Sequence, residues 1–215
     1  MTAWQRALGA YGARRYAVLF YTLLASLVVS PLVRPLGFGG DVIEGLIAVN
    51  LLAAVLALRR ASARWPAAAI LLAIALTRFL AAEEAVAAAS LVAWGLVALL
   101  AAASALAFAL RGREVGSEQV YAALSAYVLA GFCFALLYWA LDHFSPGSML
   151  AGAGTTPGTA SVATMVYFSF VTMASLGYGD VLPASDIARG LAVIEVIGGQ
   201  LYLAALVARL VGALR

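Results

Sequence analysis

Long apolar runs, separated by short polar segments, form the dominant pattern of this 215-residue chain. An apolar run of about 20 residues can cross a bilayer as a helix. The pattern therefore predicts five spans, at about residues 16–33, 42–58, 65–80, 85–110 and 119–141. A sixth apolar segment begins after Pro183 and continues for about 31 residues. As a helix it would measure roughly 46 Å, which exceeds the ~30 Å hydrocarbon core, so we expect it to tilt or bend.

Two further segments lie between the fifth and sixth spans. Residues 142–159 are rich in Gly, Ser, Thr and Pro, which predicts an extracellular loop. Residues 160–171 are apolar but too short to cross a bilayer. We interpret them as a re-entrant helix, which is possible at membrane depth only where protein surrounds it.

Composition identifies an integral membrane protein. Hydrophobic residues make up 65% of the chain and charged residues 11%, whereas soluble proteins contain about 25% charged residues. The apolar runs are too many for one cleaved signal peptide. All 13 basic residues are arginine, and the absence of lysine excludes a Walker A loop and a Schiff-base lysine. The single cysteine, Cys133, lies in an apolar run and is predicted to be a buried thiol.

The charged residues predict a topology by the positive-inside rule. The predicted inner segments hold ten arginines at the ends of the spans: Arg6, Arg14, Arg15, Arg59, Arg60, Arg64, Arg111, Arg113, Arg209 and Arg215. The predicted outer segments carry mostly acids: Asp41, Glu44, Glu83, Glu84, Asp142, Asp180 and Asp186, with Arg34, Arg78 and Arg189. We therefore expect a multi-pass cell-membrane protein with both termini in the cytoplasm. The net charge of +3 is explained without a nucleic-acid partner.

The stretch from Ser175 to Gly179, Ser-Leu-Gly-Tyr-Gly, has the chemistry of a cation selectivity filter. Such a filter needs successive backbone carbonyls that point to one side, so that rings of oxygens replace the hydration shell of an ion. Gly177 and Gly179 accept the positive φ that this backbone requires at little steric cost. The hydroxyl of Ser175 can add a ring of oxygens at the inner mouth.

Around this motif, residues 172–180 resemble the signature of tetrameric potassium channels, T-x-T-T-V-G-Y-G-D. Ser175 stands where threonine is usual and keeps the hydroxyl. Leu176 stands where valine is usual and removes the β-branching that stiffens χ1. The resemblance extends from Tyr167 through Arg189 into the helix beyond, about a third of the chain.

Residues 36–41, Leu-Gly-Phe-Gly-Gly-Asp, also read like a filter but lack its context. Pro31 and Pro35 would break a helix leading into this stretch, and Pro35 occupies the place of the hydroxyl residue. We interpret it as a glycine turn between two membrane helices.

The resemblance implies an all-α integral membrane protein with six transmembrane helices, and a re-entrant pore helix and selectivity filter between spans five and six. Residues 114–215 would form the pore domain. Residues 1–113 would form a four-helix region that resembles a voltage-sensor domain without gating arginines. One filter supplies one carbonyl per ring, so the pore requires four subunits in the lipid bilayer, most simply a homotetramer with three further copies of this chain.

The same resemblance assigns roles to individual residues. Potassium, as the permeant ion, would be bound by the filter carbonyls of residues 175–179, and no other cofactor is expected. Two aromatic residues of the pore helix would brace Tyr178. The filter would be supported by Tyr167, Phe168, Thr172 and Asp180. A gating hinge would lie at Gly198 and Gly199. The helical phase then places three side chains on the cavity wall: Gln200, Leu203 and Val207.

The predicted fourth span lacks a voltage-sensor pattern, because residues 85–110 contain no basic residue. Each elementary charge that crosses the field contributes about 2.3 kcal/mol per 100 mV. We therefore predict a potassium-selective channel that is not voltage-gated by a charged fourth span, and we expect no nucleotide- or calcium-binding domain after the sixth. The alternative is a non-selective cation channel or a non-conducting regulatory subunit. An enzyme is disfavoured, since the chain has one histidine, one cysteine and no obvious pair of catalytic carboxylates.

Polar residues within the apolar runs need partners. For Glu195, in the sixth span, we favour a hydrogen bond to the back of the pore helix at Ser169 or Thr172 over a direct functional role. Asn50 is predicted to form an interhelical hydrogen bond. Arg78 is predicted to snorkel or to pair with a nearby glutamate.

Asp180 also needs a partner. Some channels of the resembled family place an acid on the pore helix behind the filter, but here that position is Val171. We therefore expect Asp180 to bond with another group, such as Tyr167 or Arg189.

Overall fold

The computed structural model describes residues 14–33, 40–56, 84–111, 116–152 and 156–213. Most of them form helices. The elements, in chain order, are α2 (Arg15–Val33), α3 (Gly40–Leu56), α5 (Glu84–Ala109), α6 (Ser117–Phe144), β1 (Met149–Ala151), α7 (Val162–Met173), β2 (Val181–Pro183) and α8 (Asp186–Gly212). Helix is the expected state for these apolar runs, because in a bilayer every backbone polar group must find its partner within the chain.

The described helices lie close to the predicted positions. α2, α3, α5, α6 and α8 coincide with the first, second, fourth, fifth and sixth predicted spans, and α7 lies two residues later than the predicted re-entrant helix. Segments of α5, α6 and α8 are long and apolar enough to cross a membrane, and α2, α3 and α7 contribute shorter apolar helices. The protein is therefore a mainly helical membrane protein. The third predicted span, residues 65–80, lies outside the described residues, so the count of six spans stays a prediction.

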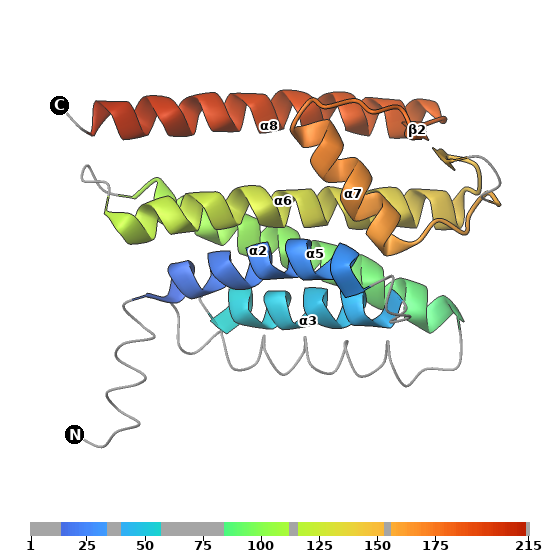
Figure 1. Ribbon diagram of the computed structural model, residues 1–215, viewed down its shortest axis with the longest axis horizontal. Coiled ribbons are helices and arrows are strands. Elements are labelled where there is room, and N and C mark those ends of the chain that lie inside the picture. The colour runs from blue at the N-terminus through green and yellow to red at the C-terminus, as the bar shows by residue number, and fades with distance from the viewer. Residues whose placement is uncertain (1–13, 34–39, 57–83, 112–115, 153–155, 214–215) are drawn as a thin grey trace, which may run out of the picture.

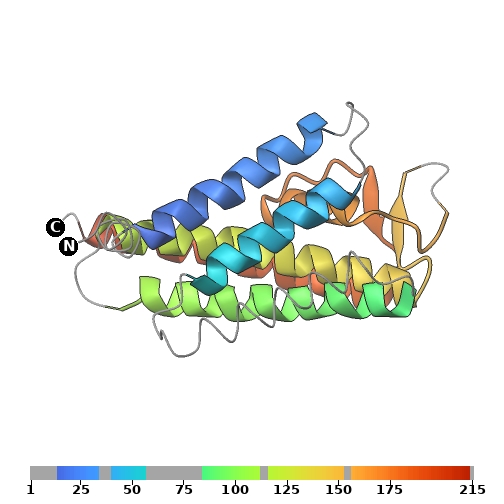
Figure 2. The same cartoon turned by 90° about the horizontal axis from the view of Figure 1, so that it is seen from below.

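Helix α6 lies at the centre of the arrangement (Figures 1 and 2). It contacts α2 and α5 on one side and α7 and α8 on the other. Helices α5 and α6 contact each other, and both carry buried small residues, among them Ala98 and Ala105 in α5 and Ala122 and Ala126 in α6. Small side chains allow two helix backbones to approach closely, which is a common basis of helix packing in membranes.

Helices α2 and α3 are joined by a buried hydrogen bond. The Asn50 amide donates to the hydroxyl of Ser26 over 2.7 Å, and Ser26 donates in turn to the carbonyl of Thr22 over 2.9 Å. The predicted interhelical bond of Asn50 is confirmed. Arg78, Glu83 and the glycine-rich stretch at residues 36–39 lie outside the described residues.

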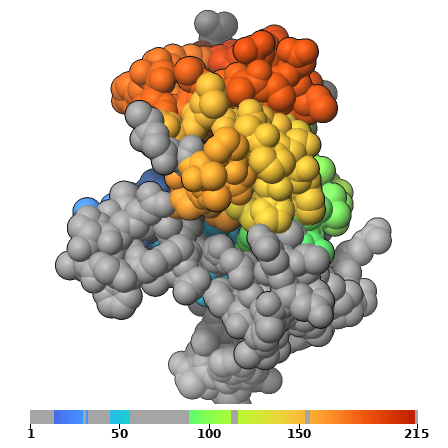
Figure 3. Space-filling view, turned by 90° about the vertical axis from the view of Figure 1, so that its right-hand side faces the viewer, coloured from blue at the N-terminus to red at the C-terminus, as the bar shows by residue number. Residues whose placement is uncertain are grey.

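A two-stranded antiparallel sheet lies at one end of the molecule and was missed by the sequence analysis. Strand β1 pairs with β2, with Leu150 opposite Leu182. Residues 142–159 are therefore not all loop, because α6 continues to Phe144 and β1 follows. Figure 3 looks onto this end, where the connection after α6 (yellow) and the segment from α7 to β2 (orange) lie side by side. The buried Asp142 carboxylate accepts the Met149 backbone N–H over 3.1 Å and holds β1 against the end of α6.

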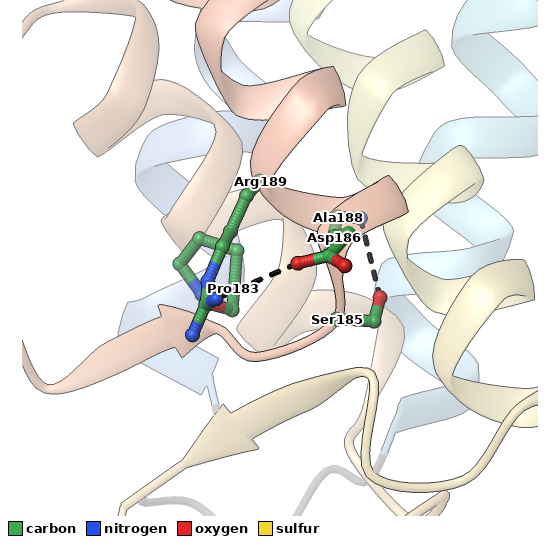
Figure 4. Close-up of polar contacts among 5 residues, drawn as sticks. All are labelled: Pro183, Ser185, Asp186, Ala188 and Arg189. Atoms are coloured by element: carbon green, nitrogen blue, oxygen red, sulfur yellow. Dashed lines mark hydrogen bonds and ion pairs between the residues drawn. The ribbon is translucent and has the colours of Figure 1, made fainter.

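Helix α8 begins at a side-chain cap. The Ser185 hydroxyl accepts the N–H of Ala188 over 3.2 Å, which satisfies one of the free donors of the first turn. Asp186 follows in that turn and lies 3.6 Å from the guanidinium of Arg189, whose Nε donates to the carbonyl of Pro183 over 3.4 Å (Figure 4). The start of α8 is therefore anchored to β2, directly after the candidate filter.

Helix α8 is continuous across Gly198 and Gly199 (Figure 1). Its buried residues within one chain are Ala188, Glu195 and Gly199, which form a single stripe that faces α6 and α7. The other faces expose large apolar side chains, among them Ile194, Ile197, Leu201 and Val207. An apolar face of this extent is typical of a surface covered by lipid or by another protein chain.

Candidate ion-conduction site

Helix α7 begins and ends with well-defined caps. At its start, the Ser161 hydroxyl accepts the Thr164 N–H over 3.2 Å. At its end, the N–H of Leu176 donates to the carbonyl of Val171 and the N–H of Ser175 donates to that of Thr172, each over 2.9 Å. These two bonds, with Ser175 at a φ of 58°, form a Schellman motif. The C-terminal cap of the helix is thus the first part of the candidate filter.

The backbone of the candidate filter alternates in conformation. Positive φ values occur at every second residue, 58° at Ser175, 61° at Gly177 and 82° at Gly179. Alternation between left-handed and right-handed regions turns successive carbonyls to the same side, whereas an extended strand points them alternately to opposite sides. A Cβ at either glycine would meet nothing within 4 Å. Within one chain, the glycines are therefore required for their conformation and not for space.

The left-handed conformation of Ser175 was not predicted from the sequence, which indicated positive φ at the two glycines and only a hydroxyl at Ser175. A non-glycine residue in this region costs roughly 1–2 kcal/mol. The signal that could have revealed this conformation is positional, since the residue directly after a helix C-cap, here Ala174, commonly adopts a positive φ.

Tyr167 links α7 to both Tyr178 and Asp180. Its ring stacks on that of Tyr178, with centroids 6.4 Å apart and planes inclined by 8°. Its hydroxyl donates to the Asp180 carboxylate over 2.8 Å, and the other carboxylate oxygen accepts the Val181 N–H over 3.1 Å. The hydrogen bond to Asp180 raises the pKa of Tyr167 above its ordinary value, so the phenol stays protonated and continues to donate.

These contacts confirm that Asp180 bonds with Tyr167. Of the two partners suggested by the sequence, Arg189 instead contacts Asp186 and Pro183. Phe168 lies on another face of α7, where it is buried and packs edge-on against Tyr138 of α6 with centroids 4.9 Å apart. Within one chain, the structure thus brings Tyr167 to Tyr178 and places Phe168 against α6.

Helix α8 holds the end of α7 at Met173. The Gln200 amide donates to the Met173 carbonyl over 3.0 Å, and the hydroxyl of Tyr127 lies 3.5 Å from the same oxygen. Gly199 is buried at this contact, where a Cβ would stand 3.3 Å from that carbonyl. Of the three residues predicted to line the cavity, Gln200 is bonded to the end of α7. Leu203 is half-buried and Val207 is exposed within one chain.

Glu195 lies one turn before Gly199 and is almost completely buried. Its carboxyl group contacts the hydroxyl of Ser169 over 2.5 Å and that of Tyr138 over 2.8 Å. The predicted bond between Glu195 and the back of the pore helix is thus confirmed at Ser169. Tyr138, the second partner, was not predicted, because the phase of α6 relative to α8 is not visible in the sequence.

A cavity of about 640 Å³ lies behind the filter, between α2, α3, α6 and α7. The side chains of Leu176 and Tyr178 line it from the filter, Phe170 from the pore helix, and Ser26 and Ile47 from α2 and α3. The candidate filter itself, residues 174–180, is exposed within one chain. The N-terminal helices thus reach the back of the candidate filter, while residues 174–180 stay exposed within one chain.

Comparison with known proteins agrees with this site. Residues 122–215, from α6 to the end of the chain, match the sequence profile of the ion channel family. Over 94 residues the chain is 32% identical to the voltage-gated potassium channel Kch of Escherichia coli (strain K12). That match covers 44% of this chain and 21% of the relative, so the chain spans about a fifth of the length of the curated protein that it matches. No solved structure matches the chain.

Proposed function

We propose that this chain, whose residues 122–215 belong to the potassium channel family, is the subunit of a potassium-selective channel that conducts ions passively across the membrane. The observation that carries the proposal is the alternation of positive φ at Ser175, Gly177 and Gly179 directly after a capped pore helix. This backbone can direct consecutive carbonyls to one side, as ion coordination requires.

Potassium would bind to the backbone carbonyls of residues 175–179, which replace its hydration shell. Tyr167 would hold the outer part of the filter through its contacts with Tyr178 and Asp180. Thr172 would hold the inner part, because its carbonyl accepts the Ser175 N–H. The C-terminus of α7 would direct the partial negative charge of the helix dipole toward the dehydrated ion in the cavity.

The complete pore would be a homotetramer, because one chain supplies one carbonyl to each ring. Two features of the chain support this assembly. Residues 174–180 are exposed within one chain, and α8 buries few of its side chains against its own subunit. In the tetramer, the filters would face the common axis and α8 would line the cavity with Leu203 and Val207, while Gln200 stays bonded to the pore helix.

Six spans with both termini in the cytoplasm complete the proposed arrangement. The end of the molecule that carries β1, β2 and Asp180 would then be extracellular. The opposite end, which carries Arg14, Arg15 and Arg209, would be cytoplasmic, in agreement with the positive-inside rule.

We propose further that a charged fourth span does not gate this channel. Helix α5 contains no basic residue over its 26 residues, so movement of α5 would transfer no positive side chain across the field. The name of the Escherichia coli relative describes that protein as voltage-gated, but the match covers only 21% of that protein. A non-selective cation channel and a non-conducting regulatory subunit are the alternatives.

Reconstitution of the purified protein into planar bilayers tests the proposal. We expect single-channel currents whose reversal potential follows the potassium gradient and responds weakly to sodium. A matched pair of variants would assign the current to the filter: Gly177→Ala, which places a side chain at a φ of 61°, and Gly45→Ala in α3, where a Cβ meets nothing within 4 Å. Equal potassium and sodium permeability would support the non-selective alternative. Absence of current from an intact tetramer would support a regulatory subunit.

A further inference from the structure

The carboxyl group of Glu195 lies where three helices meet. It belongs to α8, one of its oxygens contacts Ser169 of α7, and the other contacts Tyr138 of α6. Ser169 is itself within 2.8 Å of the carbonyl oxygen of Gly131, also in α6. Four polar groups are thus linked in one buried chain of contacts, behind the pore helix and away from the exposed filter.

The number of protons available to these four groups decides whether Glu195 is charged. The Gly131 carbonyl can only accept, and the Ser169 hydroxyl has one proton to donate. If Glu195 were an ionised carboxylate, it also could only accept. Ser169 would then have two acceptors, at 2.5 and 2.8 Å, and only one proton for both. One of these short oxygen–oxygen contacts would have no hydrogen between its atoms, which is unfavourable in a buried site.

A protonated carboxyl group removes this conflict. Tyr138 donates to one oxygen of Glu195, the other oxygen of Glu195 donates its proton to Ser169, and Ser169 donates to the Gly131 carbonyl. Every contact then contains one hydrogen, and the direction of donation is the same along the whole chain. The carboxyl group lies inside the protein with no ion-pair partner among the described residues, where a charged form is costly.

We propose that Glu195 is a neutral, protonated carboxylic acid, and that its proton ties α8 to the pore helix through Ser169. Glu195 is then a positioning residue, because it fixes Ser169, six residues before Ser175 at the start of the filter, without touching the ion. Loss of the proton would break the Glu195–Ser169 bond or the Ser169–Gly131 bond. The consequence for conduction rests on the channel function proposed above, whereas the protonation state of Glu195 does not.

Other groups that could ionise near Glu195 are few. From α6, Tyr127, Cys133 and Tyr138 are close enough to interact with its charge. From α7, the only ionisable side chain is Tyr167, which bonds with Asp180 instead. Strand β2, which also contacts α8, has none. All of these side chains are neutral at neutral pH, because the ordinary pKa is about 8.5 for cysteine and about 10 for tyrosine, so a change that begins around neutral pH and is lost in Glu195→Gln would report Glu195.

Infrared spectroscopy of the reconstituted full-length protein tests the protonation state directly. A protonated carboxyl group has a carbonyl band that is separate from the bands of carboxylates. We expect this band at neutral pH in the wild type and its loss in Glu195→Gln. Asp142→Asn is the matched control, because Asp142 is the other buried acid among residues with described side chains. The part of the carbonyl band that is lost in Glu195→Gln must remain in Asp142→Asn. If the wild type shows no such band at neutral pH, the proposal is wrong.

Potassium flux from the same vesicles tests the link to the pore helix. Glu195→Gln keeps both contacts, because its amide can donate to Ser169 and its carbonyl can accept from Tyr138, but it cannot ionise. We expect wild-type flux to fall reversibly as the pH rises and the acid ionises, and Glu195→Gln flux to stay constant over the same range. The same pH dependence in both proteins would overturn the positioning role. If neither protein conducts, the channel function fails, and the infrared result still decides the protonation state.

Discussion

Gly199 of α8 lies directly against Met173, the last residue of α7, and a Cβ at Gly199 would stand 3.3 Å from the Met173 carbonyl oxygen. The neighbouring Gly198 is exposed, and a Cβ there would meet nothing within 4 Å. The two adjacent glycines therefore have different surroundings. One allows α8 to approach the filter, and the other is free of contacts within its own chain.

This difference predicts opposite effects of two matched substitutions. Gly199→Ala should lower stability by about 1 kcal/mol or more, because the added methyl group crowds a backbone carbonyl. Gly198→Ala should raise stability by roughly 0.5–1 kcal/mol, since alanine favours a helix interior over glycine. Thermal unfolding of the purified assembly measures both. If Gly199→Ala lowers open probability but leaves stability unchanged, the pair acts as a hinge and the packing interpretation is wrong.

The Tyr167–Asp180 hydrogen bond is expected to stabilise the conducting filter. Tyr167→Phe keeps the ring that stacks on Tyr178 and removes the hydroxyl, so the loss should be about 1 kcal/mol because the bond is partly exposed to solvent. We expect shorter single-channel bursts with unchanged potassium selectivity. Asp180→Asn should have a similar effect, and the double variant should be no worse than the more severe single variant. Additive effects would show that the two residues act independently.

The left-handed conformation of Ser175 predicts a separation of two effects. Ser175→Ala and Ser175→Gly both remove the hydroxyl, but only glycine relieves the strain of a positive φ, by about 1 kcal/mol. Thermal unfolding should therefore show that Ser175→Gly is more stable than Ser175→Ala. Any change in conductance should be the same in both variants, because both lack the hydroxyl. Equal stability of the two variants would contradict the Schellman conformation. The β-branched Ser175→Val should be the least stable of the series.

Weak voltage dependence is expected for open probability, because α5 carries no basic residue. The measurement is a conductance–voltage curve from purified protein in bilayers, recorded without blockers. A steep sigmoidal curve would contradict the proposal. A shallow curve that changes with the permeant ion would agree with it, because ion occupancy of the filter can itself respond to the field.

The sequence alone determined the class of the protein and the position of its candidate site. Apolar runs of membrane length, arginines at their ends and the Ser-Leu-Gly-Tyr-Gly motif are local features, and helices in a bilayer form wherever such runs occur. The partners of Asn50, Asp180 and Glu195 were also within reach of sequence reasoning, since a buried polar group must find a nearby donor or acceptor.

The tertiary structure alone decided how the helices face one another. It placed Tyr138 on Glu195 and Phe168 on Tyr138, and it paired β1 with β2. It also put the pocket behind Tyr178, between α2, α3 and α7. Such contacts depend on the rotation of each helix about its axis. Because several of these helices are apolar on every side, their sequences carry little information about which face packs inward. Close packing between particular side chains fixes that rotation, and it exists only in the folded chain.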